Sequence, residues 1–216
     1  MTDGISRSYF GGDKMSPIPE FYDPMDIHDY MYRPGMYYSD DPKKYHTVHH
    51  AVNMFDLLYF YSMSLAYEFS GFDSHRLKEA IAWHDSVYVP GSKTNEEDSV
   101  ELYKSNGGDD PVVIEAILST KIGNKEFKNS VEMILHDLDW SGFIDYDTMC
   151  NNEKKIIYEC TFDGRYTEAE AMEGQIKFYK SIVNDPIYVT KTFKVYNDIA
   201  RGNIKRRLAE LTGERE

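Results

Sequence analysis

Histidine and aspartate residues stand close together at three places in the sequence, and these are the side chains best suited to chemistry. They form three pairs: His46 and His50, His84 and Asp85, and Asp137 and Asp139. Imidazole nitrogens and carboxylate oxygens together bind divalent metals, and either group can accept or donate a proton. We therefore expect a divalent metal site, for which the residue types alone leave Mg, Mn, Fe, Co, Ni and Zn open.

The residues around the first pair predict a helix that turns both histidines toward a core. At 100° per residue, His46 and His50 fall on the same side of a helix as Met54 and Leu65. A single histidine on such an apolar face is often a hydrogen-bonded core residue. Two histidines one turn apart can instead converge on one metal ion or one phosphate.

The other two pairs lie near the ends of predicted helices. His84 shares the inward face of its helix with Ile81, whereas Asp85 diverges by 100°, so both can reach one ion only beyond the helix end. An aspartate near a helix C-terminus is unfavourable for the helix dipole, which suggests that another group holds Asp85. Asp139 lies at the edge of an apolar stripe and Asp137 lies further round, and simple solvent exposure is the alternative for both.

The spacing of apolar residues predicts an all-α protein. The expected helices cover about residues 45–69, 74–86, 94–105, 110–121, 125–140, 147–160, 167–183 and 190–211. Residues 1–41 contain four of the eight prolines and predict an extended N-terminal arm with at most short helical turns. We therefore divide the chain into an arm, residues 1–41, and a helical domain, residues 42–216, with at least eight helices and no sheet of more than two short strands.

The charge and apolar content of the chain limit the kinds of partner that it can bind. Lys and Arg number 24 against 37 Asp and Glu, so the net charge of the 216-residue chain is 24 − 37 = −13. A protein this acidic lacks the basic surface that binding a long nucleic acid requires. The most apolar stretch, residues 54–69, is shorter than the ~18 apolar residues of a membrane span, and no secretory signal opens the sequence. We expect a cytoplasmic protein without membrane or nucleic-acid partners, and leave homo-oligomers open.

The order of these motifs resembles the HD superfamily of metal-dependent phosphohydrolases. Within it, the closest likeness is to a branch described as predicted metal-dependent HD phosphohydrolases, over roughly residues 36–212. The matching segments are Tyr38 to His50, Ala82 to Tyr88, Asn95 and Glu96 with Ser99, Thr120 and Lys121, Asp137 to Asp139, and Ala200 to Ile204 with Leu208 and Leu211. The resemblance implies an HD-domain helical bundle.

The resemblance also implies roles for individual residues. The implied metal ligands are His50, His84, Asp85 and Asp139, with Asp137 as the alternative to Asp139. His46 would face the substrate or a second metal, Lys121 would neutralise phosphate, and Asp85 would also act on the attacking water. Asn95 and Glu96 would order the loop after Asp85 or reach the site, unless they only begin a helix.

Three positions depart from the family pattern. Ile122, Gly123 and Asn124 follow Lys121 where the family has a histidine, which leaves fewer ligands for a second metal. Lys44 stands where an arginine is usual, so a bidentate grip on phosphate is lost there. Gln175 stands where the later helices often carry an arginine.

The function that follows is hydrolysis of a small phosphorylated metabolite, with a nucleotide as the favoured substrate, by a water that the metal activates. One alternative is a nucleotide-binding HD protein without turnover, acting as a sensor or inhibitor. The other is a di-iron HD oxygenase. That chemistry needs extra histidines between His84 and Asp139, where the sequence offers only His136.

Overall fold

The computed structural model describes residues 24–70 and 73–213. These residues form ten α-helices: α1 (Pro24–Met31), α2 (Val48–Glu68), α3 (Ser74–Trp83), α4 (Asn95–Ser105), α5 (Pro111–Ser119), α6 (Ser130–Asp139), α7 (Tyr146–Thr161), α8 (Glu168–Ile182), α9 (Lys191–Lys194) and α10 (Asn197–Thr212). Two 3₁₀ turns, η1 (Pro34–Met36) and η2 (Trp140–Phe143), accompany them. Within the described ranges there is no β-strand, and Ser39 and Thr47 form a single isolated bridge. The prediction of an all-α fold is confirmed.

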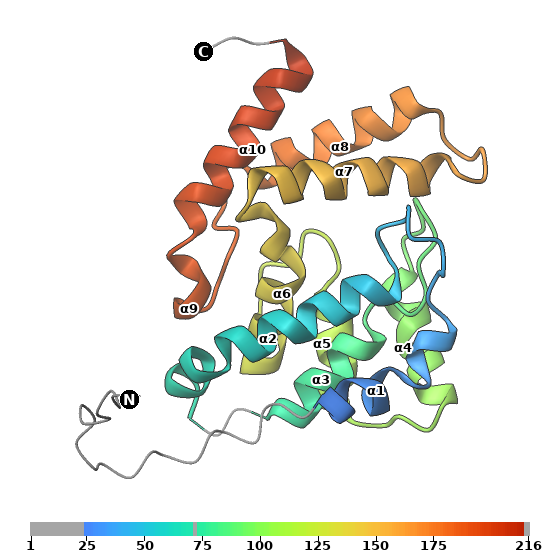
Figure 1. Cartoon of the computed structure of the whole chain (residues 1–216), viewed down its shortest axis with the longest axis vertical. Coiled ribbons are helices and arrows are strands. Elements are labelled where there is room, and N and C mark those ends of the chain that lie inside the picture. The colour runs from blue at the N-terminus through green and yellow to red at the C-terminus, as the bar shows by residue number, and fades with distance from the viewer. Residues whose placement is uncertain (1–23, 71–72, 214–216) are drawn as a thin grey trace, which may run out of the picture.

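The helices form a body and a hairpin that lies across it (Figure 1). In the body, α5 packs against α3, α4 and α6, and α2 packs against α3 and α6. The turn η2 leads the chain from α6 into α7, which pairs with α8 in the hairpin, and α10 packs against α8. Residues from both the body and the hairpin line one cavity, described below.

Helix starts in the body are fixed by side chains that accept backbone N–H groups. Asp73 accepts from Arg76 before α3, Asp110 accepts from Val112 before α5, and Asn129 accepts from Glu132 before α6. Between these helices the side chains of the core are fully buried, among them Leu77, Ile81, Ile117, Ile134 and Leu135. Caps and core together hold α3 and α6 in place, and the candidate ligands from these two helices lie at or just after their C-terminal ends.

Two helix boundaries differ from the predicted ones in a way that matters for the site. α2 begins after Thr47, so His46 lies in the segment before the helix and not on it. α3 ends at Trp83, His84 is the residue that caps it, and Asp85 lies in the following turn. Because Asp85 has left the helix, the 100° divergence from its neighbour no longer keeps the two side chains apart.

The last predicted helix, residues 190–211, is divided in the structure. α9 ends at Lys194 and α10 begins at Asn197, whose side chain accepts the N–H groups of Ile187 and Tyr188 and donates to the carbonyl oxygen of Tyr188. These bonds tie the start of α10 to the loop before α9. The sequence contains no glycine or proline at this break, which is why the pattern predicted one continuous helix.

The described part of the predicted arm, residues 24–41, packs on the helical body. It contains α1 and η1, Met31 and Tyr38 are buried, and the hydroxyl of Tyr38 donates to the carbonyl oxygen of Ala82. α1 is eight residues long, longer than the short turns expected there. Residues 1–23 of the arm lie outside the described residues. None of the described helices is long and apolar enough to span a membrane.

Candidate metal centre

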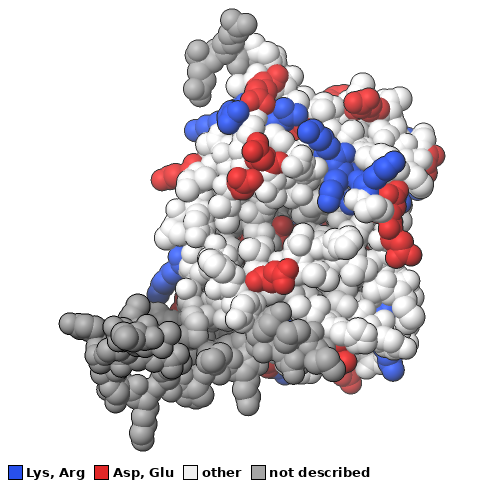
Figure 2. All heavy atoms as spheres, in the orientation of Figure 1, with Lys and Arg blue, Asp and Glu red and all other residues white. Residues whose placement is uncertain are grey.

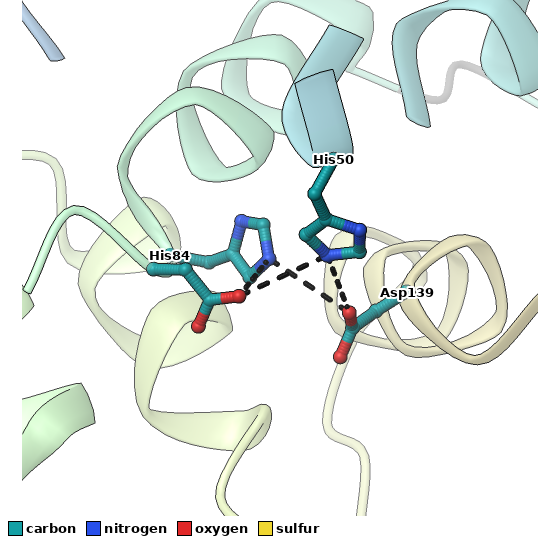
Figure 3. Close-up of side chains that lie close together, drawn as sticks. His50, His84 and Asp139 are labelled. Carbon is teal, nitrogen blue, oxygen red and sulfur yellow. Dashed lines mark hydrogen bonds and ion pairs between the residues drawn. The ribbon is translucent and has the colours of Figure 1, made fainter. Parts of the chain in front are cut away.

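Three helices and one turn bring four of the predicted ligands together (Figure 3). His50 lies in the first turn of α2, His84 caps the end of α3, Asp85 lies in the turn after it, and Asp139 is the last residue of α6. Each offers one ligand atom, and these four atoms all lie within 4.8 Å of one another. The sequence prediction of one group formed by these four residues therefore agrees with the structure.

The distances within this group show two close pairs that share a centre. His50 Nε2 lies 2.9 Å from Asp139 Oδ1 and 3.8 Å from Asp85 Oδ2. His84 Nε2 lies 3.0 Å from Asp85 Oδ2 and 3.8 Å from Asp139 Oδ1. Each histidine nitrogen thus faces both carboxylates, so the four ligand atoms converge and could hold a single cation.

His84 provides the strongest test of whether a cation fits. Its Nδ1 donates to the carbonyl oxygen of Ile81 at 2.8 Å, so in the neutral ring Nε2 carries a lone pair. Nε2 is buried and makes no hydrogen bond, although a carboxylate oxygen of Asp85 is near it. A buried ring nitrogen that faces carboxylates needs a positive partner, which is either a proton on the ring or a metal ion between ring and carboxylates. Two imidazoles and two carboxylates suit a divalent transition metal, so the residues present fit the metal.

The charges around His84 also favour a cation at this point. Burial alone would lower the pKa of His84, but the neighbouring charge of Asp85, helped by Asp139, raises that pKa to about 9. Burial would raise the pKa of Asp85, but the facing histidines hold it well below its usual range. The carboxylates therefore create a field that attracts positive charge, and a metal ion that binds there displaces protons.

His46 lies beside the group of four ligands without belonging to it. Its Nδ1 is 2.6 Å from Glu159 Oε2 of α7, and its Nε2 is 3.9 Å from Asp85 Oδ2. The ring stacks on Tyr88, with ring centroids 3.3 Å apart. Burial opposes a proton on this ring, but Asp85 and Glu159 outweigh it and raise the pKa of His46. The side chain is held by α7 and the loop after α3, and not by the helical phase that the sequence suggested.

Asp137, the alternative ligand, does not reach the group. Its two carboxylate oxygens accept the backbone N–H groups of Val189 and Thr190, at 2.9 and 2.8 Å. Burial raises its pKa to about 6, against these hydrogen bonds. In the structure Asp137 holds the chain that enters α9, while Asp139, two residues later, faces the histidines.

Lys121 is placed differently from its predicted role. Its ammonium pairs with Glu97 of α4, and the side chain is 43% exposed. Its neighbours Thr120 and Ile122 line a cavity next to the four candidate ligands, whereas Lys121 does not line it. The cation expected to neutralise phosphate is therefore held by a surface carboxylate in this structure.

The loop after Asp85 is clamped by the start of α4. The Asn95 side chain accepts from the N–H of Val89 and donates to its carbonyl oxygen, at 2.9 and 3.2 Å. The Ser99 hydroxyl does the same for Val87, at 3.1 and 3.3 Å. Asn95 therefore orders this loop, one of the two roles predicted for it, and the loop presents Tyr88 to the ring of His46.

A cavity of about 430 Å³ opens beside the metal group, under the hairpin of α7 and α8. Asp85, Asp139 and His46 form part of its wall, and aromatic side chains form much of the rest. These aromatic residues are Tyr45, Tyr88, Trp140, Phe143, Tyr166, Phe178 and Tyr179. A cavity of this size holds a small organic molecule next to the metal group.

Glu159 contacts His46 beside the candidate site, and no sequence motif pointed to it. It lies 113 residues from the histidine that it holds. α7 carries Met149, Glu153 and Ile156 on one stripe, and Glu159 follows at the same spacing, so two acids occur on an inward face. Acids at core positions of an amphipathic helix are the signal that could have revealed it.

Comparisons of the chain with protein-family models, with curated proteins and with solved structures found no match. Membership of the HD superfamily therefore stays a prediction from the motifs.

Proposed function

We propose that this protein is a metal-dependent phosphohydrolase that acts on small phosphorylated metabolites. The observation that carries the proposal is the group of His50, His84, Asp85 and Asp139, whose ligand atoms surround one point at the wall of a cavity. The unsatisfied Nε2 of His84 supports a metal there. A divalent ion in such a site would polarise a phosphoryl oxygen and lower the pKa of a bound water.

In this proposal Asp85 and His46 take the remaining roles in the reaction. Asp85 lies in the cavity wall, where its carboxylate can orient the attacking water and accept its proton. His46 presents Nε2 on the side of Asp85, because Glu159 accepts a hydrogen bond from Nδ1. From that position Nε2–H donates to a phosphoryl oxygen or to the leaving group. This assignment gives to His46 part of the role that the sequence gave to Lys121.

The two alternatives differ from this proposal in testable ways. The di-iron oxygenase needs His136 as a further ligand, but the Nε2 of His136 lies 3.0 Å from the carbonyl oxygen of Ile187 and is engaged by the backbone. The sensor without turnover would keep the same ligands and bind the same molecules. Only a measurement of turnover separates it from the hydrolase.

The test is metal analysis of the purified protein combined with a screen of phosphomonoesters and phosphodiesters. We expect about one divalent ion per chain, release of phosphate from at least one ester, and loss of that release with a chelator. A protein with full metal content that hydrolyses none of the esters contradicts the proposal and favours the sensor. Two irons per chain with an oxidised product favour the oxygenase.

A further inference from the structure

The cavity wall is unusual in its charges. Among the described residues that line it, five are acidic and none is lysine or arginine; the acidic ones are Asp85, Glu96, Asp139, Glu153 and Glu170. Asp85 and Asp139 face the metal position, and Glu153 is paired with Arg207 behind the wall. Glu170 accepts the backbone N–H and the hydroxyl of Thr167 at the start of α8, and burial raises the pKa of Glu96, an effect that the charge of Lys121 only partly opposes. Any phosphate that lies beyond reach of the metal therefore meets carboxylates.

Basic side chains lie on the outer surface of this part of the molecule instead. Figure 2 shows lysine and arginine gathered on the face where α7 crosses the body. Lys43 lies over the ring of Tyr158 and Lys44 over the ring of Phe162, and neither lysine is among the residues that line the cavity. The positive charge available inside the cavity is therefore the metal and His46, which is enough for one phosphoryl group.

The rest of the wall suits a flat, uncharged body. Phe178 packs edge-on against Trp140, and Phe143 lies next to both rings, so these three form a continuous aromatic surface beside Asp139. Asn152 and Gln175 add neutral amide groups from α7 and α8. Aromatic side chains stack on planar rings, and amides can bond polar atoms at a ring edge.

We infer that the substrate carries a single phosphoryl group on an uncharged, planar aromatic body, and that compounds with two or three linked phosphates are discriminated against. This inference rests on the proposed function for its reaction, but its binding part can be tested without turnover. A volume of about 430 Å³ leaves a small aliphatic phosphate with much of the aromatic wall uncovered. The aromatic body is thus expected to supply affinity that the phosphate alone does not.

The experiment uses the metal-loaded full chain and two matched series. Adenosine mono-, di- and triphosphate share one ring and differ in phosphate number, whereas 1-naphthyl phosphate and glycerol 3-phosphate share one phosphate and differ in the body. We expect kcat/KM for each aromatic monophosphate to exceed that for the polyphosphates and for glycerol phosphate by about tenfold or more. Equal values across either series overturn the inference while leaving the hydrolase intact.

Binding is measured in parallel, by calorimetry, with 1-naphthylmethylphosphonate and methylphosphonate, which cannot be hydrolysed. Tighter binding of the naphthyl compound by about tenfold supports the inference even if no ester is turned over, in which case only the proposed function fails. Equal or absent binding of the two phosphonates overturns the inference.

Two pairs of variants assign the effect to the wall. Glu96→Gln is expected to narrow the preference for mono- over diphosphate severalfold, and Glu101→Gln, on the exposed face of the same helix, is expected to leave it unchanged. Phe178→Leu keeps an apolar side chain but removes the ring, so affinity for the naphthyl phosphonate falls about threefold to tenfold. Phe60→Leu, which is far more exposed on α2, is its control. An unchanged preference in Glu96→Gln together with unchanged affinity in Phe178→Leu contradicts the inference.

Discussion

Two groups of buried charges border the same cavity, and they differ in whether their charges are compensated. Around Glu153 of α7, the carboxylate receives Arg207 at 2.6 Å and the hydroxyl of Tyr179 at 3.1 Å. Around His84, a buried ring nitrogen makes no hydrogen bond and two carboxylates face it. Glu153 and His84 are equally hidden, each 1% exposed.

The difference separates structural from ligand-binding charge. A buried carboxylate that is bonded by a bidentate arginine and a hydroxyl requires no further ligand, because its charge is paired and its oxygens accept hydrogen bonds. The buried ring nitrogen of His84 holds a proton in the protein alone, because the two carboxylates raise its pKa, and it can exchange that proton for a metal ion. We therefore expect substitutions in the first group to change stability and substitutions in the second group to change metal binding and turnover.

The largest effect is expected at the uncompensated group. Asp139→Ala removes one of four ligands and half of the carboxylate charge that attracts the metal, so metal content and phosphatase activity should fall together to the level of the chelated protein. Metal content is measured by elemental analysis, and turnover with the best ester of the screen.

Thermal unfolding gives an independent control for this variant. A metal at a hundred times its dissociation constant stabilises the native protein by about 2.7 kcal/mol, so the native chain should melt at a higher temperature when metal is added. Asp139→Ala should show no such rise. If Asp139→Ala keeps its metal and still melts at a higher temperature when metal is added, Asp139 is not a ligand.

The compensated group should respond in stability and not in metal content. Arg207→Met leaves Glu153 buried without its partner, and breaking a buried ion pair in this way costs about 3–5 kcal/mol of unfolding free energy. Metal content per folded chain should be unchanged. The measurement is urea unfolding, and Arg206→Met, whose side chain is 63% exposed, should cost less than about 1 kcal/mol.

A double variant sharpens this test. Replacing both partners, as Glu153→Gln with Arg207→Met, removes the uncompensated charge and should recover part of the lost stability. If the single variant Arg207→Met lost its metal at full stability, the distinction between the two groups would fail.

An intermediate effect is expected at His46, which touches both the site and α7. His46→Ala should keep its metal, because His46 is not one of the four ligands, and should lose on the order of 10²-fold in turnover, the scale of general acid–base catalysis. Glu159→Gln keeps the size of the side chain but weakens the hold on Nδ1, so a smaller loss is expected. Normal turnover by a fully metallated His46→Ala variant would contradict the assignment.

The sequence predicted the grouping of the four candidate ligands more reliably than their surroundings. His50, His84 and Asp139 lie on or next to apolar stripes of α2, α3 and α6, and those stripes must face a shared core. The stripes explain why these residues meet, whereas the resemblance to the HD superfamily selected them as a ligand set. The helix ends were harder to predict. α3 ends at Trp83, one residue before His84, and this early end allows Asp85 to turn toward the group.

Contacts made by distant segments could not be predicted from local pattern. Glu159 and Glu153 lie on the inward stripe of α7, which marks them as unusual, but the stripe does not show which residues they bond. Their burial depends on His46 and Arg207, which lie far away in the chain. Lys121 was predicted to bind phosphate, but its ammonium pairs with Glu97 on the neighbouring helix.

The smallest of these effects, and the most direct contrast, concerns the two aspartates at the end of α6. Asp137 resembles Glu153 in that its acceptors are used: the backbone N–H groups of Val189 and Thr190 bond its two oxygens. Asp137→Ala leaves both N–H groups buried without acceptors, which should cost about 2 kcal/mol of unfolding free energy. Its metal content should match that of the native chain.

Asp139→Ala is the matched control, because it removes the same chemical group two residues away on the same helix. It should lose the metal, and its unfolding free energy in chelator should stay close to that of the chelated native chain. If compensation decides the role of a buried charge, the two variants must show opposite patterns, one in stability and the other in metal content. Metal loss in Asp137→Ala with metal retained in Asp139→Ala would reverse the assignment. It would mean that α6 turns its other aspartate toward the histidines.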